Sequence, residues 1–163
     1  DLHVLARRQR QMCIRDRITQ AWDLMVNYGY LEAEYKDYLA DLNGDNVITD
    51  NSGLIPRNTP ENTFGITTSY TTQIGDGELK GRVSYRFRDE MNSDSSNNPL
   101  GDLDSIENVN ATISYSLENY SVSVWGRNLT DEREQRWATI GGLTSRGWWN
   151  EPATLGITFS ASY

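Results

Sequence analysis

The sequence predicts an all-β protein, specifically an antiparallel up-and-down membrane β-barrel fragment of about six strands. Three observations lead to this prediction. Apolar and polar side chains alternate in several separate segments, and helical periodicity is absent. The segments run about 9–11 residues, the length at which a tilted strand crosses a bilayer. Short turns and long polar loops also alternate along the chain.

Strands are expected, in chain order, at residues 22–34, 63–73, 79–88, 109–117, 120–127 and 155–163. The alternation is cleanest in the third, fourth and sixth of these segments. In residues 79–88 one face carries Leu79, Gly81, Val83, Tyr85 and Phe87. The opposite face carries Lys80, Arg82, Ser84, Arg86 and Arg88. In residues 109–117 and 155–163, apolar residues alternate with Asn, Ser, Thr or Gly in the same way.

The connections between these segments differ in length. Residues 73–77 and 118–119 form tight turns, whereas residues 35–62, 90–106 and 128–153 form long polar connections. Short turns at one end and long loops at the other are typical of outer-membrane barrels. In a soluble domain, three loops of this length would count against the strand assignment.

Each expected strand has an apolar face and a polar face. This pattern suits either a half-solvated antiparallel sheet or a membrane barrel, and strand length favours the barrel. We expect a curved sheet in chain order, not closed on itself, with both edge strands unpaired. The residues expected to share its convex outer face are Leu79, Val83, Tyr85, Val109, Ile113, Tyr115, Val122, Val124, Leu155, Ile157 and Phe159.

Composition excludes several classes of protein. The net charge is −8, which argues against nucleic acid as a partner because phosphate binding needs a basic surface. A single Cys rules out an internal disulfide framework. The sequence has no run of about 18 apolar residues, so no transmembrane helix is expected.

Residues 1–17 differ from the rest of the chain. They hold five Arg together with the only His and the only Cys. The segment resembles a translated sequencing-library adapter, with residues 7–17 matching a transposon end read in one frame. The alternative is a basic N-terminal arm. We treat residues 1–17 as non-native and expect them to form no strand pairing and to make few contacts.

Three stretches of residues 18–163 carry a family resemblance. The first is NYGYLEAEY at 27–35, followed by RNTPENT at 57–63. The second is VWGRNLTDE at 124–132, and the third is Glu151-Pro152 with a final strand ending in Tyr163. In these motifs and their order, the chain resembles the C-terminal end of a TonB-dependent outer-membrane receptor. Family members mostly end in Phe, and Tyr163 keeps the aromatic ring that the resemblance links to barrel insertion.

The resemblance implies a barrel of about 22 strands closed around a plug domain. Residues 18–163 would be its C-terminal part, without the plug and the TonB-contacting segment. The implied function is TonB-dependent active import of a scarce nutrient, an iron–siderophore complex first, with cobalamin and oligosaccharides as alternatives. The implied location is the outer membrane of a Gram-negative bacterium. The implied partners are outer-membrane lipid, the plug domain, the TonB complex, the barrel assembly machinery and a small-molecule metal chelate.

A candidate calcium site lies in the first long loop. Residues 41–52 resemble part of an EF-hand loop, with oxygen ligands at positions 1, 3, 5, 7 and 9. These positions are Asp41, Asn43, Asp45, Val47 (through its carbonyl) and Thr49. Position 6 is Asn46, which tolerates a left-handed turn, and position 12 is Ser52 in place of the bidentate Glu. The alternative is a solvated acidic loop, and no other cofactor is expected.

Two further groups are candidate contacts for a ligand or the plug. Lys80, Arg82, Arg86 and Arg88 share one strand face and could attract an anionic ferric complex or pair with acidic plug residues. Trp148 and Trp149 lie in the last long loop with Trp137. They could bind a ligand, join an aromatic girdle or pack loop on loop.

Three functions therefore compete at this level. A nutrient-import receptor leads, and a secreted or surface β-domain with a calcium loop serving adhesion is the alternative. A barrel enzyme is the weakest, because residues 18–163 contain no His or Cys to build a catalytic triad, a thiol nucleophile or a Cys/His metal site. The carboxylate pairs Asp89-Glu90 and Asp131-Glu132 are expected to end strands, since adjacent strand residues face opposite ways. We therefore expect no enzyme activity.

Overall fold

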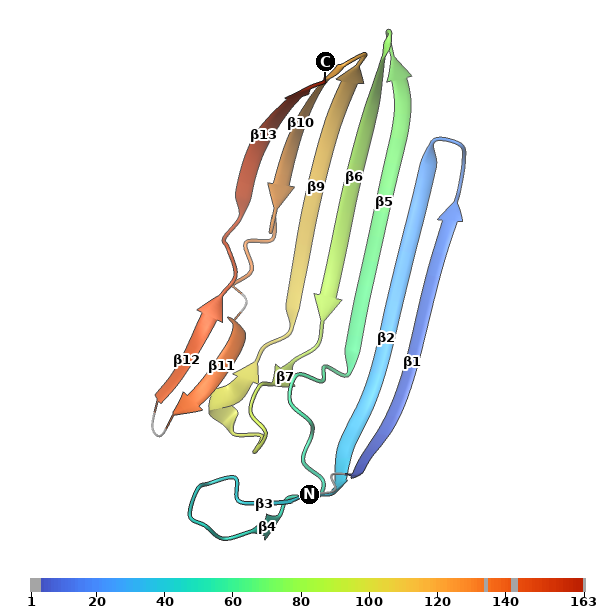
Figure 1. The fold of residues 1–163 in the computed structure, drawn as a ribbon. Helices are drawn as coiled ribbons and strands as arrows, with labels where there is room; N and C mark the ends of the chain where they lie inside the picture. The colour runs from blue at the N-terminus through green and yellow to red at the C-terminus, as the bar shows by residue number, and fades with distance from the viewer. Residues whose placement is uncertain (1–3, 134, 142–143, 163) are drawn as a thin grey trace.

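The structure is a computed structural model that describes residues 4–133, 135–141 and 144–162. Its main feature is one curved antiparallel sheet of seven strands, which lie side by side in chain order (Figure 1). The strands are β1 (Val4–Arg17), β2 (Trp22–Asp37), β5 (Asn62–Ile74), β6 (Gly77–Arg88), β9 (Ile106–Leu117), β10 (Tyr120–Arg127) and β13 (Thr154–Ala161). The all-β class and the up-and-down order expected from the sequence are confirmed.

The six expected strands correspond to β2, β5, β6, β9, β10 and β13, with some boundaries moved. β9 begins three residues before the expected start, at Ile106. Its first residues pair with the end of β6, where Arg88 faces Ile106 and Arg86 faces Asn108. The hydrogen-bonded ladder to a neighbouring strand therefore extends β9 beyond the segment in which its own side chains alternate.

The expectation that residues 1–17 form no strand pairing is wrong. β1 is antiparallel to β2 along its whole length, from Val4 opposite Asp37 to Arg17 opposite Asp23. Ladder hydrogen bonds join backbone groups, so the open edge of β2 accepts an extended segment with little regard to its sequence. The outer edge of β13 has no partner strand among the described residues, so only one of the two expected free edges is found as predicted.

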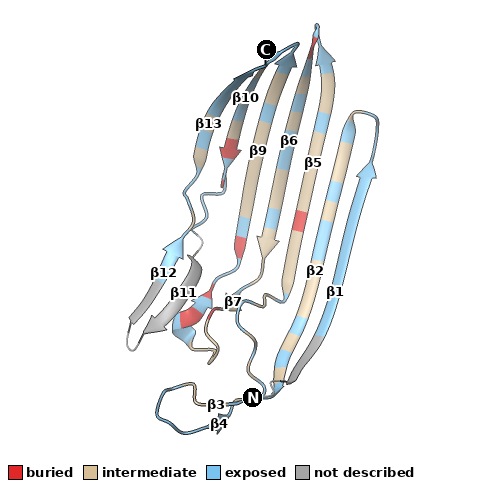
Figure 2. Cartoon of the chain, viewed as in Figure 1, coloured by how far each residue is buried: buried red, intermediate tan, exposed pale blue. Residues whose placement is uncertain are grey.

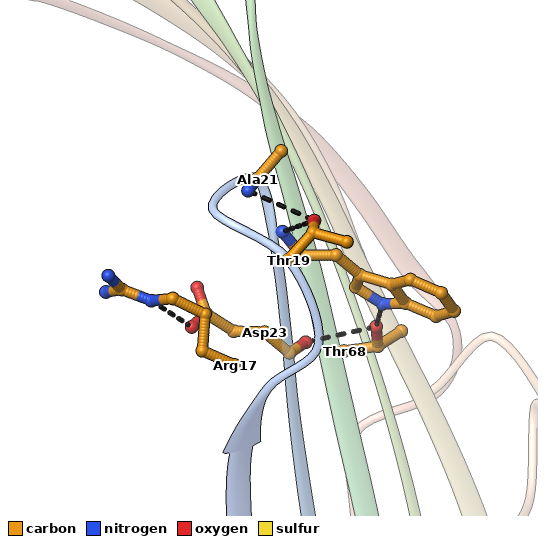
Figure 3. A network of polar contacts seen from close by, with 6 residues as sticks. Arg17, Thr19, Ala21, Asp23 and Thr68 are labelled. Atoms are coloured by element: carbon orange, nitrogen blue, oxygen red, sulfur yellow. Dashed lines mark hydrogen bonds and ion pairs between the residues drawn. The ribbon is translucent and has the colours of Figure 1, made fainter.

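A short turn joins β1 to β2. Thr19 Oγ1 accepts hydrogen bonds from the backbone N–H of Ala21 at 3.2 Å and of Trp22 at 3.1 Å (Figure 3). Arg17 and Asp23 form an ion pair at 3.5 Å, with their side chains 71% and 48% exposed. An ion pair this exposed adds little stability, so pairing of β1 depends on its backbone. The side chains of residues 8–17 are all exposed (Figure 2).

Short turns lie at one end of the sheet and long connections at the other (Figure 1). The long connections contain short elements of their own. β3 (Leu39–Ala40) pairs with β4 (Thr49–Asp50), β7 (Met91–Asn92) pairs with β8 (Asp102–Leu103), and β11 (Gln135–Gly141) pairs with β12 (Thr144–Trp149). The 3₁₀ helix η1 (Pro99–Gly101) lies between β7 and β8. In the described chain, no helix has the length and apolar character needed to cross a membrane.

The register places the expected apolar residues on one face, as predicted. Directly paired residues of antiparallel strands share a face, and Leu79, Tyr115, Val122 and Phe159 form one continuous row. The remaining members of the predicted set fall on the same face through the rows that follow. Ile157 and Leu155 are each 75% exposed, so a broad apolar surface has no cover in this chain.

Aromatic side chains gather at both ends of this apolar face. At the short-turn end Trp22 pairs with Tyr70, Tyr115 and Phe159 lie in the next row, and Tyr120 lies in the row after that. At the loop end Tyr28, Phe64 and Phe87 share a row, and Tyr85 and Tyr30 lie in the rows on either side of it. The row between the two groups is aliphatic or small and includes Val83, Ala111 and Leu155. An apolar band with aromatic residues at both ends is typical of the outer surface of membrane barrels.

Few side chains are buried, and the buried apolar ones lie near the long connections. Leu103 is 2% exposed, Ile106 8% and Tyr38 9%. Apart from a buried position in β5, at Gly65, the middle of the sheet is half-buried or exposed (Figure 2). The described chain is therefore a single β-layer whose compact part is the cluster of connections at the loop end.

Candidate ligand-binding cleft

The polar face of the sheet carries the basic residues that the sequence singles out on β6. Lys80 lies between Thr71 and Ser114, and Arg82 lies between Ser69 and Thr112. Polar partners on both neighbouring strands confirm that this face is continuous across the sheet. Nearer the loop end, Arg86 and Arg88 continue the same face.

A cleft of about 570 Å³ opens at the loop end of this face, where β6, β9 and β10 meet the last long connection. Its lining is basic and rich in amides. The lining residues are Arg86, Arg88, Ile106, Asn108, Asn110, Arg127, Asn128, Trp149, Asn150, Glu151 and Pro152. Of the six predicted contact residues the cleft brings together Arg86, Arg88 and Trp149, whereas Lys80, Arg82 and Trp148 do not line it.

The three arginines of the cleft differ in the contacts that their guanidinium groups make. Arg88 is half-buried, and its guanidinium donates to the backbone carbonyls of Asp89 at 2.9 Å and Asp104 at 3.0 Å. The two backbone carbonyls orient this guanidinium. Arg86 and Arg127 are exposed, and neither has an ion-pair partner among the residues that the structure describes. Arg127 lies beside Trp125, with its guanidinium carbon 5.0 Å from the ring centroid.

Asn128 connects the segments that line the cleft through hydrogen bonds. Its side chain is 5% exposed, and its Nδ2 donates to the carbonyls of Glu132 and Glu151, both at 3.0 Å. Its Oδ1 accepts from Asn108 Nδ2 at 3.0 Å, and its backbone N–H donates to Asn110 Oδ1 at 2.9 Å. One buried amide therefore joins β9, the exit of β10 and the segment that returns to β13.

The sequence interpretation missed part of this site. Arg127 and Asn110 lie on the polar face of predicted strands, so alternation gave a signal for them, whereas Asn108 precedes the strand predicted at 109–117. Trp125 and Asn128 belong to the motif at 124–132 that carried the family resemblance. Their convergence with β6 depends on strand register, which the sequence does not state.

One carboxylate of each pair, Asp89 and Asp131, accepts hydrogen bonds where a strand ends, as expected. Asp89 Oδ2 accepts from Asn62 backbone N at 3.0 Å and from Asn62 Nδ2 at 2.7 Å. Asp131 Oδ1 accepts from the backbone N–H of Ala153 at 2.9 Å. Each carboxylate therefore joins a strand exit to a neighbouring segment.

The candidate calcium loop has the backbone shape that the sequence indicates. Asn46 adopts a left-handed φ of 65°. Asp41 Oδ1 accepts from the backbone N–H of Gly44 at 2.7 Å, and Asp41 Oδ2 accepts from that of Asn46 at 2.7 Å. Asp45 Oδ1 accepts from Val47 N–H at 2.7 Å. The oxygens expected to bind calcium thus also hold the loop together.

Other side chains of the loop bind one another or the strands that flank it. Thr49 Oγ1 donates to the carbonyl of Ala40 at 3.2 Å, and Asn43 Nδ2 donates to Asp45 Oδ2 at 2.9 Å. Asp50 Oδ1 accepts from the backbone N–H and the hydroxyl of Ser52, so these contacts lower the pKa of the Asp50 carboxyl. Within the described chain no cluster of three or more His, Cys, Asp or Glu could hold a metal ion.

Two sequence predictions fall on positions for which little is described. Tyr163, the expected barrel-insertion aromatic, lies outside the described residues. Trp137 lies in β11 and pairs with Trp148 through the backbone, and Trp148 is 74% exposed. This exposure does not distinguish among the three roles considered for Trp148, which are ligand binding, membership of an aromatic girdle and packing between loops.

Comparisons with solved structures give the same fold. The ferric yersiniabactin uptake receptor FyuA from Yersinia pestis matches with a TM-score of 0.84 at 15% identity, over 99% of this chain and 24% of the receptor. The siderophore receptor PiuA from Acinetobacter baumannii matches with a TM-score of 0.81 at 18% identity, over 99% and 22%. BauA, the ferric preacinetobactin receptor from Acinetobacter baumannii, matches with a TM-score of 0.72 at 16% identity, over 98% and 22%.

The chain therefore spans about a quarter of the length of the similar receptors. A search of the curated proteins found no match. The family model described as TonB dependent receptor-like, beta-barrel matches residues 8–129, which is most of the chain. With the single-layer barrel wall and its two distinct faces, this match shows that the chain belongs to the TonB-dependent receptor β-barrel family.

Proposed function

We propose that residues 18–163 form the C-terminal part of a longer receptor in the outer membrane of a Gram-negative bacterium. The receptor would import an iron–siderophore complex by TonB-dependent active transport. The plug domain and the TonB-contacting segment would lie elsewhere in the same receptor. The family match and the similarity to three siderophore receptors support this proposal.

The two faces of the sheet support the same proposal. The apolar face with its aromatic ends suits contact with lipid. From Leu79 to Phe87 it extends about 26 Å along β6 at about 3.3 Å per residue, which for a strand tilted by about 40° is a rise of roughly 20 Å, comparable with the apolar height of about 25 Å in such barrels. The polar face would then line the lumen, and the barrel assembly machinery would insert the wall.

The observation that carries the ligand assignment is the cleft at the loop end. Three arginines, several amides and Trp149 converge there, beside the long connections that would face the outside. Charged and aromatic groups at a concave site are typical of small-molecule recognition. The adhesion alternative has no comparable observation in its favour.

The proposal is tested with the complete gene. Extending the reading frame upstream is expected to reveal a plug domain and a TonB-contacting segment. The complete receptor is then expressed in a Gram-negative host that lacks its own siderophore receptors, and uptake of radiolabelled iron is measured with a panel of siderophores. We expect uptake that disappears when TonB is deleted. Cobalamin and oligosaccharides serve as the comparison substrates, and uptake of none of these compounds would refute the proposal.

A further inference from the structure

Asn43 and Gly44 form the one Asn-Gly pair in the sequence. Both residues are exposed and lie in the first long connection, between β3 and β4. Glycine has no Cβ, so the backbone nitrogen of Gly44 is open to approach by the side chain that precedes it. Gly44 also has a φ of 77°, which residues with a Cβ rarely adopt. The conformation of the loop therefore favours glycine directly after Asn43.

An Asn side chain that is followed by glycine can react with the backbone. The Gly44 nitrogen loses its proton to water or hydroxide and attacks Cγ of Asn43. The bond between Cγ and Nδ2 breaks, the side-chain nitrogen takes up a proton and leaves as ammonia, and a cyclic imide remains. Water then opens the imide at either carbonyl, which gives aspartate or isoaspartate at position 43. The net reaction consumes one water and releases one ammonia.

The structure places a carboxylate against the nitrogen that must react. The Gly44 N–H donates to Asp41 Oδ1 at 2.7 Å, a short bond between an amide and an acidic group that is ionised at neutral pH. Deprotonation would put a negative charge on this nitrogen beside the negative carboxylate, and like charges at such a distance disfavour each other. The bond to Asp41 therefore lowers the reactivity of the Gly44 nitrogen.

A second carboxylate holds the side chain that is attacked. Asn43 Nδ2 donates to Asp45 Oδ2 at 2.9 Å, and Asn43 Oδ1 accepts from the backbone N–H of Asp45 at 3.2 Å. Both bonds hold the side-chain amide against Asp45, so rotation of Cγ towards the Gly44 nitrogen must compete with them. The contacts that control the reaction all lie within residues 41–45, so they come from one loop.

We propose that Asn43 is a site of spontaneous deamidation and that the Asp41 carboxylate sets its rate. The inference goes beyond the import function, because it concerns a covalent change within one long connection. Deamidation replaces the amide that donates to Asp45 with a carboxylate. Negative charges at positions 41, 43 and 45 then repel one another, and the contact with Asp45 is lost. The modified loop is less ordered and carries one more negative charge.

The test follows residue 43 over time in the 163-residue chain, held in detergent micelles at neutral pH. Peptide mapping by mass spectrometry measures the fractions of aspartate and isoaspartate at this position. We expect both products, formed about tenfold more slowly than in a synthetic peptide of residues 38–50, because the peptide has no fixed bond to Asp41.

Asn51, in the same long connection, is the internal reference. Its Nδ2 donates to the carbonyls of Ala40 at 3.0 Å and Thr49 at 2.9 Å, and Ser52 follows it in place of glycine. We therefore expect Asn51 to stay intact over the period in which residue 43 reacts.

Variants separate the charge of Asp41 from the order of the loop. Asp41→Ala removes the acceptor and is expected to raise the rate about tenfold, to that of the peptide. Asp41→Asn keeps an acceptor oxygen but removes the charge, so we expect an increase of about threefold. Hydrogen exchange of the Val47 amide, which reports the order of the loop, should stay unchanged in Asp41→Asn. The matched control is Asp50→Asn, which removes a carboxylate that is bonded to Ser52, and it is expected to leave the rate unchanged.

Two results would overturn the inference. One is an unmodified residue 43 in the wild-type chain after the peptide has reacted completely, which would show that Asn43 is not a modification site. The other is the same rate in the wild-type chain, Asp41→Ala and Asp41→Asn, which would show that Asp41 does not control the reaction. Neither result depends on iron uptake, so failure of the proposed function is detected separately by the uptake assay.

Discussion

Asn97 holds Ile55 through two hydrogen bonds that join separate long connections. The backbone N–H of Ile55 donates to Asn97 Oδ1 at 2.8 Å, and Asn97 Nδ2 donates to the carbonyl of Ile55 at 2.8 Å. The two residues are 42 positions apart in the sequence. Nearby, Asn58 N–H donates to the carbonyl of Asn92 at 2.8 Å. The first two long connections are thus bound to each other as well as to the sheet.

The first prediction concerns this pair of hydrogen bonds. Asn97→Ala removes both bonds at a cost of about 1–3 kcal/mol and also disfavours the left-handed φ of 53° at this position. We expect faster amide hydrogen exchange in residues 51–62 as well as in residues 91–103. Asn97→Gly keeps the backbone conformation without the side chain and isolates the hydrogen bonds. Faster exchange confined to residues 91–103 would show that the two connections are independent.

The second prediction concerns the buried amide of Asn128. Asn128→Asp is nearly isosteric and tolerates the φ of 49°, but it replaces the donor to Glu132 and Glu151 with an acceptor. Two carbonyls would then face a buried carboxylate, so we expect local destabilisation of about 2–3 kcal/mol. Proteolysis of residues 129–153 should become faster while the sheet remains intact. Thr130→Val is the control, because it removes the hydroxyl that donates to Asn128 Oδ1 at 3.3 Å and to the Glu107 carbonyl at 3.0 Å but leaves the Asn128 donors in place.

The third prediction concerns residues 1–17. The side chains of residues 8–17 are exposed, and residues 4–17 pair with β2 alone within the main sheet. If the segment is non-native, as its sequence indicates, its removal should leave the strand content of residues 18–163 unchanged in micelles. Far-ultraviolet circular dichroism of the shortened chain measures this. A collapse of the remaining strand signal would show that β1 is a required part of the sheet.

The fourth prediction concerns acid. Partial burial raises the pKa of the Asp94 carboxyl. Hydrogen bonds from Ser96 and Asn98 and the positive charge of Arg57 lower it by a larger amount, so the net pKa lies below the ordinary value. A lowered folded-state pKa stabilises the loop above the ordinary carboxyl pKa of 3.8, and this stabilisation is lost as the pH falls through the folded-state pKa.

We therefore expect hydrogen exchange protection around residues 93–98 to disappear under acidic conditions that leave the sheet protected. In Asp94→Asn this acid sensitivity should vanish. Acid sensitivity that persists in the variant would assign the effect to another carboxyl.

The fifth prediction concerns calcium in residues 41–52. Position 12 is Ser52, so two carboxylate oxygens and one negative charge are missing, and Asp50 is engaged with Ser52. We expect weak binding, with a dissociation constant of about 10⁻⁴–10⁻³ M. Isothermal titration measures it, and Asp45→Ala should abolish the heat. If millimolar calcium produces no heat and Asp45→Ala leaves protease sensitivity unchanged, the site does not exist.

The sequence by itself determined six of the seven strands of the main sheet, their order and the two faces of the sheet. Leu79, Val83 and Tyr85 alternate with Lys80, Arg82 and Arg86, and this period of two fixes which side chains share a face before any neighbour is known. The short turns at 73–77 and 118–119 then force consecutive strands to be neighbours. Local patterns therefore sufficed for the architecture.

Only the tertiary structure decided the cleft and the pairing of β1. Arg86 and Arg127 come from strands that are separated by β9. They converge for two reasons: the register places Arg86 opposite Asn108, and Asn128 joins Asn108 to the exit of β10. A short turn sets the register of β9 and β10, but a long connection joins β6 to β9, so no turn geometry specifies the register of that pair. The pairing of β1 depends on the backbone, since an open backbone edge of β2 orders a segment whose side chains show no alternation.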